Sequence, residues 1–329
     1  TMSDTRKRIK GNSMQDLKSI SEIFTQRIFR IPDYQRGYSW TSKQLREFWE
    51  DVNNLPTNRS HYMGMLTLKE VGQDVWERWN DELWLIKDRK YRPFHVVDGQ
   101  QRLTTTVIFI HVIYKFIKRL KQDSNSAIAD IYLGSFSLKD IIEQYLFIQK
   151  PPEKILTSYK FGYETDNPSF QYLRYRIFEE RDAGGIEETL YTLNLSNAKK
   201  FFSENIKELY EQEGEDAVDE LFLKVTQNLK FNVYEISDDF DVFVAFETMN
   251  NRGKPLSNLE LLKNRLIYLS TLYNDSEIKA DEKESLRRDI NDAWKEVYSL
   301  WFNQTKNCAG CLAVHDCGLS LLLRSLCCF

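Results

Sequence analysis

The most informative absence in this chain is cysteine, because none occurs before Cys308 and all five fall between Cys308 and Cys328. Secreted folds held together by disulfides spread their cysteines through the chain, so that class is excluded for the residues before Cys308. No run of about eighteen apolar residues is present, and we predict no membrane-spanning helix. Thr1 to Lys10 is charged and lacks the apolar region of a signal sequence, so we expect a cytoplasmic protein.

No sign of charge dominates either. The 45 basic and 49 acidic residues give a net charge of −4, which argues against a protein that coats DNA or a membrane surface. A local basic face remains open, because net charge does not report how charge is distributed. The chain also lacks internal repeats and low-complexity linkers, and its 42% hydrophobic content can fill a core.

The periodicity of apolar residues predicts an α+β fold, with a small mixed sheet followed by a larger helical bundle. Strands are expected at 28–32, 62–68, 83–86, 91–97 and 231–236, and the third and fourth are expected to form a hairpin. Helices are expected at 13–27, 41–52, 103–121, 137–149, 168–180, 196–212, 215–228, 240–250, 257–273 and 283–302. We expect three consecutive blocks: a core over 1–121, a helical domain over 122–306 and an atypical Cys-rich tail over 307–329.

The segment 94–106 predicts a strand, a tight turn at Gly99 and the start of a helix. Free N–H groups at a helix start favour an anion, and we predict a nucleotide phosphate site there. Arg102 would add a bidentate contact and a threonine hydroxyl a further one, while Asp98 would hold Mg²⁺. The alternative is a capped turn in which Asp98 caps the helix and Arg102 pairs with a carboxylate. A P-loop is excluded, because no Gly-Lys-Ser/Thr ending follows.

Two other polar segments are candidates for ligand contact. The loop Ile31–Trp40 combines three aromatic side chains with Arg36, which suits base stacking and a phosphate contact. Its composition by itself favours the alternative, in which the aromatics pack on the core and Arg36 forms a salt bridge. The segment Phe246–Ser257 predicts a helix–turn–helix corner stopped by Gly253, and its polar residues suit a charged ligand that the spacing does not identify.

Taken together, these segments resemble the GmrSD-type restriction family, and within it the amino-terminal domain. The resemblance consists of four features in order over roughly residues 13 to 270. They are Ile-Pro-x-Tyr-Gln-Arg-x-Tyr-x-Trp, a strand with Gly64, Val-Asp-Gly-Gln-Gln-Arg-Leu-Thr-Thr, and Phe-Glu-Thr-x-Asn-x-Arg-Gly-x-Pro-Leu. Three separated motifs that occur in the same order identify a family more specifically than any single motif does.

The resemblance implies a fold similar to ParB and sulfiredoxin, and an activity that binds and hydrolyses nucleoside triphosphates in bacterial defence against phage. The implied catalytic residues are Asp98, Gln100, Gln101 and Arg102, with Asp98 also the metal ligand. The implied nucleotide-binding residues are Tyr34, Gln35, Arg36, Gly99, Thr104, Thr105, Asn250, Arg252 and Gly253. A nucleoside triphosphate is the expected substrate or ligand, and Mg²⁺ the expected cofactor.

Many members of the family carry a carboxy-terminal nuclease domain of the HNH kind with a His-x-x-Pro element. After residue 303 this chain has only His315, which no proline follows. We therefore expect nuclease activity from a separate HNH subunit, unless the chain is truncated. The tail offers Cys308, Cys311, His315 and Cys317 as soft metal ligands, but the cramped spacing of the last pair favours a truncated or frameshifted end over a zinc site.

The alternative function is a nucleotide-gated DNA-binding or sensor module without significant turnover. DNA would then be a partner, and a basic face would be expected from Lys199, Lys200, Arg252, Lys254, Lys263 and Arg265.

Overall fold

The computed structural model of the chain describes residues 17–121, 127–165, 167, 169–180, 186, 188–236, 258–272 and 280–307. The chain divides into two compact units, each assembled from segments far apart in the sequence. The first unit comprises 1–32, 40–162 and 197–255, and the second comprises 33–39, 163–196 and 256–329. The chain therefore passes from one unit to the other several times, whereas the sequence predicts consecutive blocks that the chain would leave only once each.

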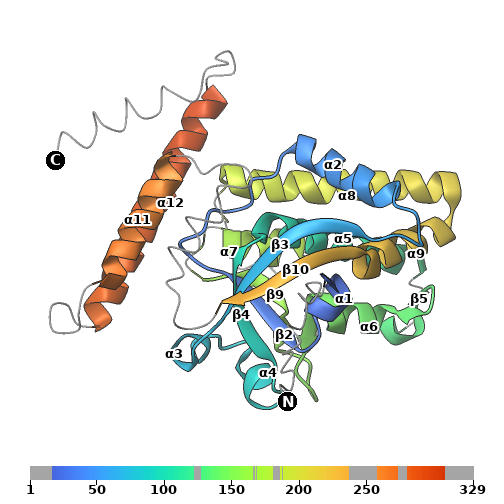
Figure 1. Cartoon of the computed structure of the whole chain (residues 1–329), viewed down its shortest axis with the longest axis horizontal. Coiled ribbons are helices and arrows are strands. Elements are labelled where there is room, and N and C mark those ends of the chain that lie inside the picture. Colours follow the sequence, from blue (N-terminus) through green and yellow to red (C-terminus); the bar gives the residue numbers. More distant parts are fainter. Residues whose placement is uncertain are drawn as a thin grey trace, which may run out of the picture. The chain divides into compact units, whose positions relative to one another are not determined.

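A six-stranded mixed sheet is the centre of the first unit (Figure 1). Its order is β1 (Leu17–Ser19), β10 (Leu229–Ile236), β3 (His61–Glu70), β4 (Arg92–Asp98), β2 (Arg27–Ile31) and β9 (Phe161–Tyr163). Strand β3 is parallel to β10 and antiparallel to β4, while β2 is parallel to β4. The α+β class and the mixed sheet are thus confirmed.

Two bulges shape the central strands. Met63 is skipped in the pairing of β3 with β10, and Val97 is skipped in the pairing of β3 with β4. A bulge bends the strand and re-aims the side chains beside it. Beyond the second bulge, Asp98 at the end of β4 pairs with Thr67 of β3.

The remaining described segments are mainly helical. The α-helices are α1 (Ile20–Ile23), α2 (Ser42–Asn53), α3 (Gln73–Trp76), α4 (Leu83–Lys87), α5 (Gln100–Lys121), α6 (Leu138–Ile141), α7 (Ser169–Tyr172), α8 (Leu190–Glu213), α9 (Glu215–Leu223), α11 (Asn258–Leu272) and α12 (Ala280–Asn307). A 3-10 turn, η1 (Ile128–Asp130), and three π-helical turns, η2 (Ile142–Leu146), η3 (Leu173–Ile177) and η4 (Lys224–Asn228), join them. Two short pairs, β5 (Tyr132–Leu133) with β6 (Phe136–Ser137) and β7 (Phe147–Gln149) with β8 (Thr157–Tyr159), complete the strands.

Aromatic packing holds three of these helices together in the first unit. Phe48 of α2, Phe109 of α5 and Phe202 of α8 are buried and contact one another edge to face. Their ring centroids lie between 4.8 and 5.9 Å apart, within the range of favourable aromatic pairs. Burial of these rings fixes α5, and so the turn that precedes it.

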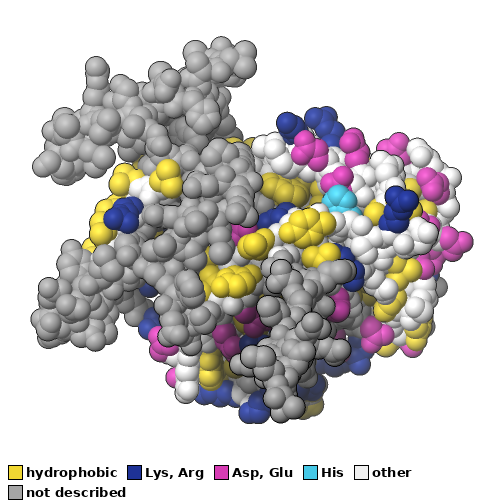
Figure 2. All heavy atoms as spheres, in the orientation of Figure 1, with side chains coloured by type: hydrophobic (Ala, Val, Ile, Leu, Met, Phe, Trp, Pro, Cys, Tyr) yellow, Lys and Arg dark blue, Asp and Glu magenta, His cyan; other side chains and the backbone are white. Residues whose placement is uncertain are grey.

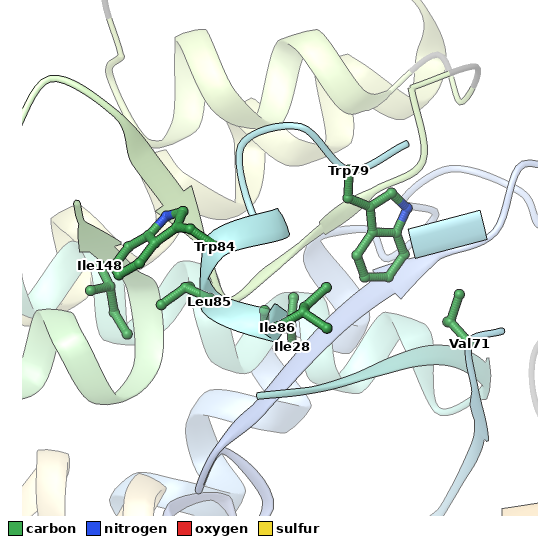
Figure 3. Close-up of a cluster of buried hydrophobic side chains, with 7 residues drawn as sticks. All are labelled: Ile28, Val71, Trp79, Trp84, Leu85, Ile86 and Ile148. Carbon is green, nitrogen blue, oxygen red and sulfur yellow. The ribbon is translucent and has the colours of Figure 1, made fainter. Parts of the chain in front are cut away.

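A second buried cluster lies where β2, α4 and β7 meet (Figure 3). Its members are Ile28, Val71, Trp79, Trp84, Leu85, Ile86 and Ile148. The indole Nε1 of Trp84 donates a hydrogen bond to Ser158 Oγ at 2.7 Å, which satisfies the one polar group that this ring buries.

Two predicted elements are wrong in type. Residues 83–86 form the helix α4 rather than a hairpin strand, because a short apolar run fits a buried helix as well as a strand. Residues 17–27 do not form one helix: β1 comes first, and Ser19 and Glu22 then form a capping box that starts α1 at Ile20. Gln26, at φ +49°, lies between α1 and β2. The predicted helix over 137–149 also ends early, since 147–149 is β7.

Most long elements match the prediction, including α2, α5, α8, α12 and the strands β3, β4 and β10. The helix predicted over 240–250 lies outside the described residues. Among the helices that the structure describes, none combines the length and the apolar character that crossing a membrane requires.

Candidate functional site

The turn between β4 and α5 is built around Gly99. Its φ of +89° is a conformation that other L-residues rarely adopt, and a Cβ there would lie 3.0 Å from both Met65 O and Leu66 Cδ1. Leu103 N donates the first helical hydrogen bond to Gly99 O. The backbone N–H groups that precede Leu103 in the first turn of α5 therefore take no part in the α-helical hydrogen-bond pattern. They lie at the positive end of the helix dipole, as the sequence predicts.

Asp98 lies at the start of this turn with its side chain about a quarter exposed. Burial raises the pKa of the Asp98 carboxyl above its usual value, although Arg102 and the Gly99 amide act to lower this pKa. A carboxylate that is costly to charge is stabilised by a nearby cation. Mg²⁺ commonly uses one or two protein carboxylates together with substrate phosphates, so Asp98 fits that role. No cluster of three or more His, Cys, Asp or Glu occurs among the described residues.

Arg102 is held against β3. Its Nη1 and Nη2 donate to Met63 O and Met65 O at 2.5 and 2.7 Å, and Nη2 lies 3.6 Å from Asp98 Oδ2. The guanidinium crosses over Gly64, where a Cβ would lie 1.8 Å from Nη1. Arg102 therefore positions β3 against the start of α5, and its predicted contact with a phosphate stays a prediction.

The other polar residues of the helix start differ in their surroundings. Gln100 is 6% exposed, and its Oε1 is buried with no hydrogen-bond partner among the described residues. The hydroxyls of Thr104 and Thr105 are buried and donate to the carbonyls of Gln100 and Gln101 at 2.7 and 2.8 Å. Both threonines thus stabilise the first turns of α5, and their direct contact with a phosphate is not tested by this geometry.

Tyr34, Gln35 and Arg36 belong to the second unit and are buried there. Arg36 Nη1 lies 3.8 Å from Glu260 Oε2, and Tyr191 donates to the other oxygen of Glu260 at 2.8 Å. Burial, followed by the charge of Asp33, raises the pKa of the Tyr34 hydroxyl above its usual value. The predicted salt bridge of Arg36 is confirmed, while its participation in a nucleotide site stays a prediction.

Asp33, next to Tyr34, connects this loop to α11 and α12. Its carboxylate accepts from Arg287 Nη2 at 3.2 Å and from Asn291 Nδ2 at 3.0 Å, and its carbonyl accepts from Lys263 Nζ at 2.8 Å. Lys263 is 4% exposed, so it does not contribute to the exposed basic face predicted from the sequence. Buried charges are tolerated when paired in this way, and the loop is well anchored within its unit.

Some predicted positions lie outside the described residues. These are Asn250, Arg252, Gly253 and Lys254 of the third motif, and the cysteine and histidine positions of the tail. The pair of β3 carbonyls that hold Arg102 is a feature that was not predicted from the sequence. The available signal was Gly64, because a glycine inside a strand pattern often marks a bulge or a close approach of another group.

The fold and the turn together define a class: an α+β protein in which a strand of a mixed sheet ends on a carboxylate, a glycine turn and a helix start suited to an anion. The chain belongs to the family described as the N-terminal domain of the GmrSD restriction endonuclease, whose model matches residues 20–267. This match confirms the resemblance drawn from the motifs and places the chain among components of restriction systems. A search of curated proteins finds no match.

Proposed function

We propose that this chain is the nucleoside triphosphate-binding and hydrolysing domain of a bacterial restriction or anti-phage system. The observation that carries the proposal is the turn formed by Asp98, Gly99 and the first residue of α5, after which the first α-helical hydrogen bond is the one from Leu103 N to Gly99 O. The backbone N–H groups that precede this bond lie at the positive end of the helix dipole, and such groups favour an anion such as phosphate. A similarity of the sheet to ParB and sulfiredoxin belongs to the same proposal.

In this proposal the helix amides bind the phosphates, and Asp98 orients the attacking water or holds Mg²⁺. When bound, Mg²⁺ neutralises charge on the phosphates. Water forms a new bond to the terminal phosphorus, the bond to the bridging oxygen breaks, and the products are a nucleoside diphosphate and inorganic phosphate. A separate HNH subunit is proposed as the source of DNA cleavage.

The test is phosphate release by the full chain from each of the four ribonucleoside triphosphates with Mg²⁺. Asp98→Asn is the preferred variant, because it removes the charge while keeping the size of the side chain. We expect release to fall by about 100-fold or more, in the range seen when one electrostatic catalytic group is removed. Arg102→Ala is less informative, since it also removes the hydrogen bonds to β3.

Asp140→Asn is a matched control. Asp140 also lies in the first turn of a helix, where it accepts a hydrogen bond from Ser137 Oγ at 2.7 Å, but it lies outside the proposed site and should leave phosphate release unchanged. No release above background from any nucleotide would overturn the hydrolytic part of the proposal. Nucleotide binding without release would instead favour the nucleotide-gated DNA-binding module.

A further inference from the structure

The loop that joins β7 to β8 in the first unit carries an apolar side chain in solvent. Backbone hydrogen bonds from Lys150 N to Leu156 O and from Lys154 N to Lys150 O, both 2.9 Å long, close this loop. Two consecutive prolines lie inside it, and proline fixes the φ angle of its own residue. Ile155 is 85% exposed, more than any other large hydrophobic residue that the structure describes. A defined loop thus presents an isoleucine to solvent.

The turn that follows α4 lies beside this loop, because both adjoin the same buried cluster (Figure 3). Trp84 of α4 and Ile148 of β7 belong to that cluster. Trp84 donates its indole hydrogen bond to Ser158 of β8, and the guanidinium carbon of Arg89 lies 5.8 Å from the centroid of the Trp84 ring. Arg89 and the next residue, Lys90, are therefore neighbours of the β7–β8 loop.

The two segments together carry an excess of positive charge. Arg89, Lys90, Lys150 and Lys154 are exposed, and none of them forms an ion pair with a described residue. Residues 88–90 and 150–155 hold these four cations and two acidic residues, which leaves a net charge of +2 on a chain whose total is −4. Figure 2 shows Lys and Arg side chains along the lower edge of the molecule, where Figure 1 places α4. Exposed lysines on several helices instead pair with a glutamate four residues later, as do Lys43, Lys139, Lys200 and Lys207.

A basic surface around one exposed apolar side chain suits duplex DNA. The duplex carries one phosphate charge about every 1.7 Å along its axis, and lysine and arginine neutralise these charges. Proteins that enter the minor groove commonly place an apolar side chain against the base steps. Lysine is depleted in protein–protein interfaces, so the charge of this surface favours DNA over a protein partner.

We propose that the loop surface formed by Arg89, Lys90, Lys150, Lys154 and Ile155 binds duplex DNA. The four cations contact backbone phosphates, and Ile155 lies in the minor groove against sugars and base edges. This contact is separate from the phosphate site at Asp98 and requires no nucleotide hydrolysis. It gives the chain its own means of holding DNA.

The experiment titrates a fluorescently labelled DNA duplex with the full chain and follows anisotropy over a series of salt concentrations. Each phosphate contact contributes about −0.9 to the slope of log K against log salt. The double variant Lys150→Ala, Lys154→Ala should therefore reduce the magnitude of this slope by about 1.8. Ile155→Ala should weaken binding by about tenfold and leave the slope unchanged, because it removes an apolar contact and no charge.

The double variant Lys200→Ala, Lys207→Ala is the matched control. It removes the same charge from α8, where the two lysines pair with Glu204 and Glu211 at 3.9 and 3.6 Å, and it should keep the slope of the unmodified chain. Equal reductions in the two double variants would overturn the inference, because net charge alone would then explain them. Failure of the unmodified chain to bind the duplex would also overturn it. So would unchanged DNA binding by the loop variants, the result expected if Ile155 contacts a protein instead. Phosphate release from nucleotides without DNA should be the same in all these variants, so the proposed function is tested separately.

Discussion

At the scale of single residues, Lys160 shows how burial changes the chemistry of one group. It is 1% exposed, and its Nζ donates to Phe24 O at 2.6 Å and lies 5.0 Å from the centroid of the Tyr91 ring. Burial lowers the pKa of the Lys160 ammonium to about 7. Between this pKa and the usual value near 10.5 the unfolded chain binds a proton that the folded chain does not, so Lys160 makes stability rise with pH over that window.

We therefore expect Lys160→Met, which keeps the length of the side chain without the charge, to flatten this pH dependence. The free energy of unfolding from urea titrations at pH 6.5 and pH 9 should rise for the unmodified chain and change little for the variant. The two proteins are compared by how the free energy of unfolding changes with pH, and not by its absolute value, because the variant also removes the hydrogen bond to Phe24 O. Equal slopes in the two proteins would show that Lys160 does not titrate in this window.

Gly64 is the residue on which the Arg102 contact depends. Its φ is +107°, and a Cβ would lie 1.8 Å from Arg102 Nη1. Gly64→Ala must strain the backbone, at about 1–3 kcal/mol, and displace a guanidinium whose hydrogen bonds are each worth about 1.5–3 kcal/mol. We expect a loss of about 4 kcal/mol or more in thermal or urea unfolding.

Gly214 provides the control for that prediction. It also has a positive φ, +86°, but a Cβ there would meet no heavy atom within 4 Å. Gly214→Ala should therefore show the backbone cost alone, about 1–3 kcal/mol. If both variants lost the same stability, the clash with Arg102 would not be the cause of the effect at Gly64.

At the scale of elements, α2, α5 and α8 contact one another through phenylalanine rings. The sequence predicts the helix in which each ring lies, but it does not show which rings contact one another. Phe202 is fully buried and lies 4.8 Å from Phe109 and 5.8 Å from Phe48, measured between ring centroids. Truncation of a buried phenylalanine costs about 3–5 kcal/mol. Phe202→Ala should lose that much in urea unfolding, and Phe201→Ala, at the neighbouring half-buried position, clearly less. Equal losses would show that the cluster is not the main support of α8.

The elements whose type was predicted wrongly include a run that lacks a visible period. The run Leu83–Ile86 is apolar at every position, so neither the period of a strand nor that of a helix is visible in it. Long elements with a clear period, such as α2 and α5, were predicted within a few residues of their ends. The capping signal at Thr41 helped, because Gln44 accepts hydrogen bonds from both the N–H and the hydroxyl of Thr41.

At the scale of the whole molecule, the proposed ligand should stabilise the chain. A nucleoside triphosphate with Mg²⁺ at 100 times its Kd adds about 2.7 kcal/mol to the stability of the part that binds it, which raises the midpoint of that transition by about 5–11 °C. We expect scanning calorimetry to show this shift for the unmodified chain and a much smaller one for Asp98→Asn. No shift with any of the four nucleotides would contradict nucleotide binding at Asp98.

The glycine turn at the start of α5 is determined by local sequence alone. A strand ending in valines, a glycine and a helix with a long apolar face specify their own conformations through backbone sterics and periodicity, and the order of motifs was enough to identify the family. Only the tertiary structure decided that Arg102 binds β3 carbonyls, that Asp33 joins α11 and α12, and that the turn after α4 lies beside the β7–β8 loop. These pairings join residues distant in the sequence, and local propensity carries no information about which strands and helices will become neighbours.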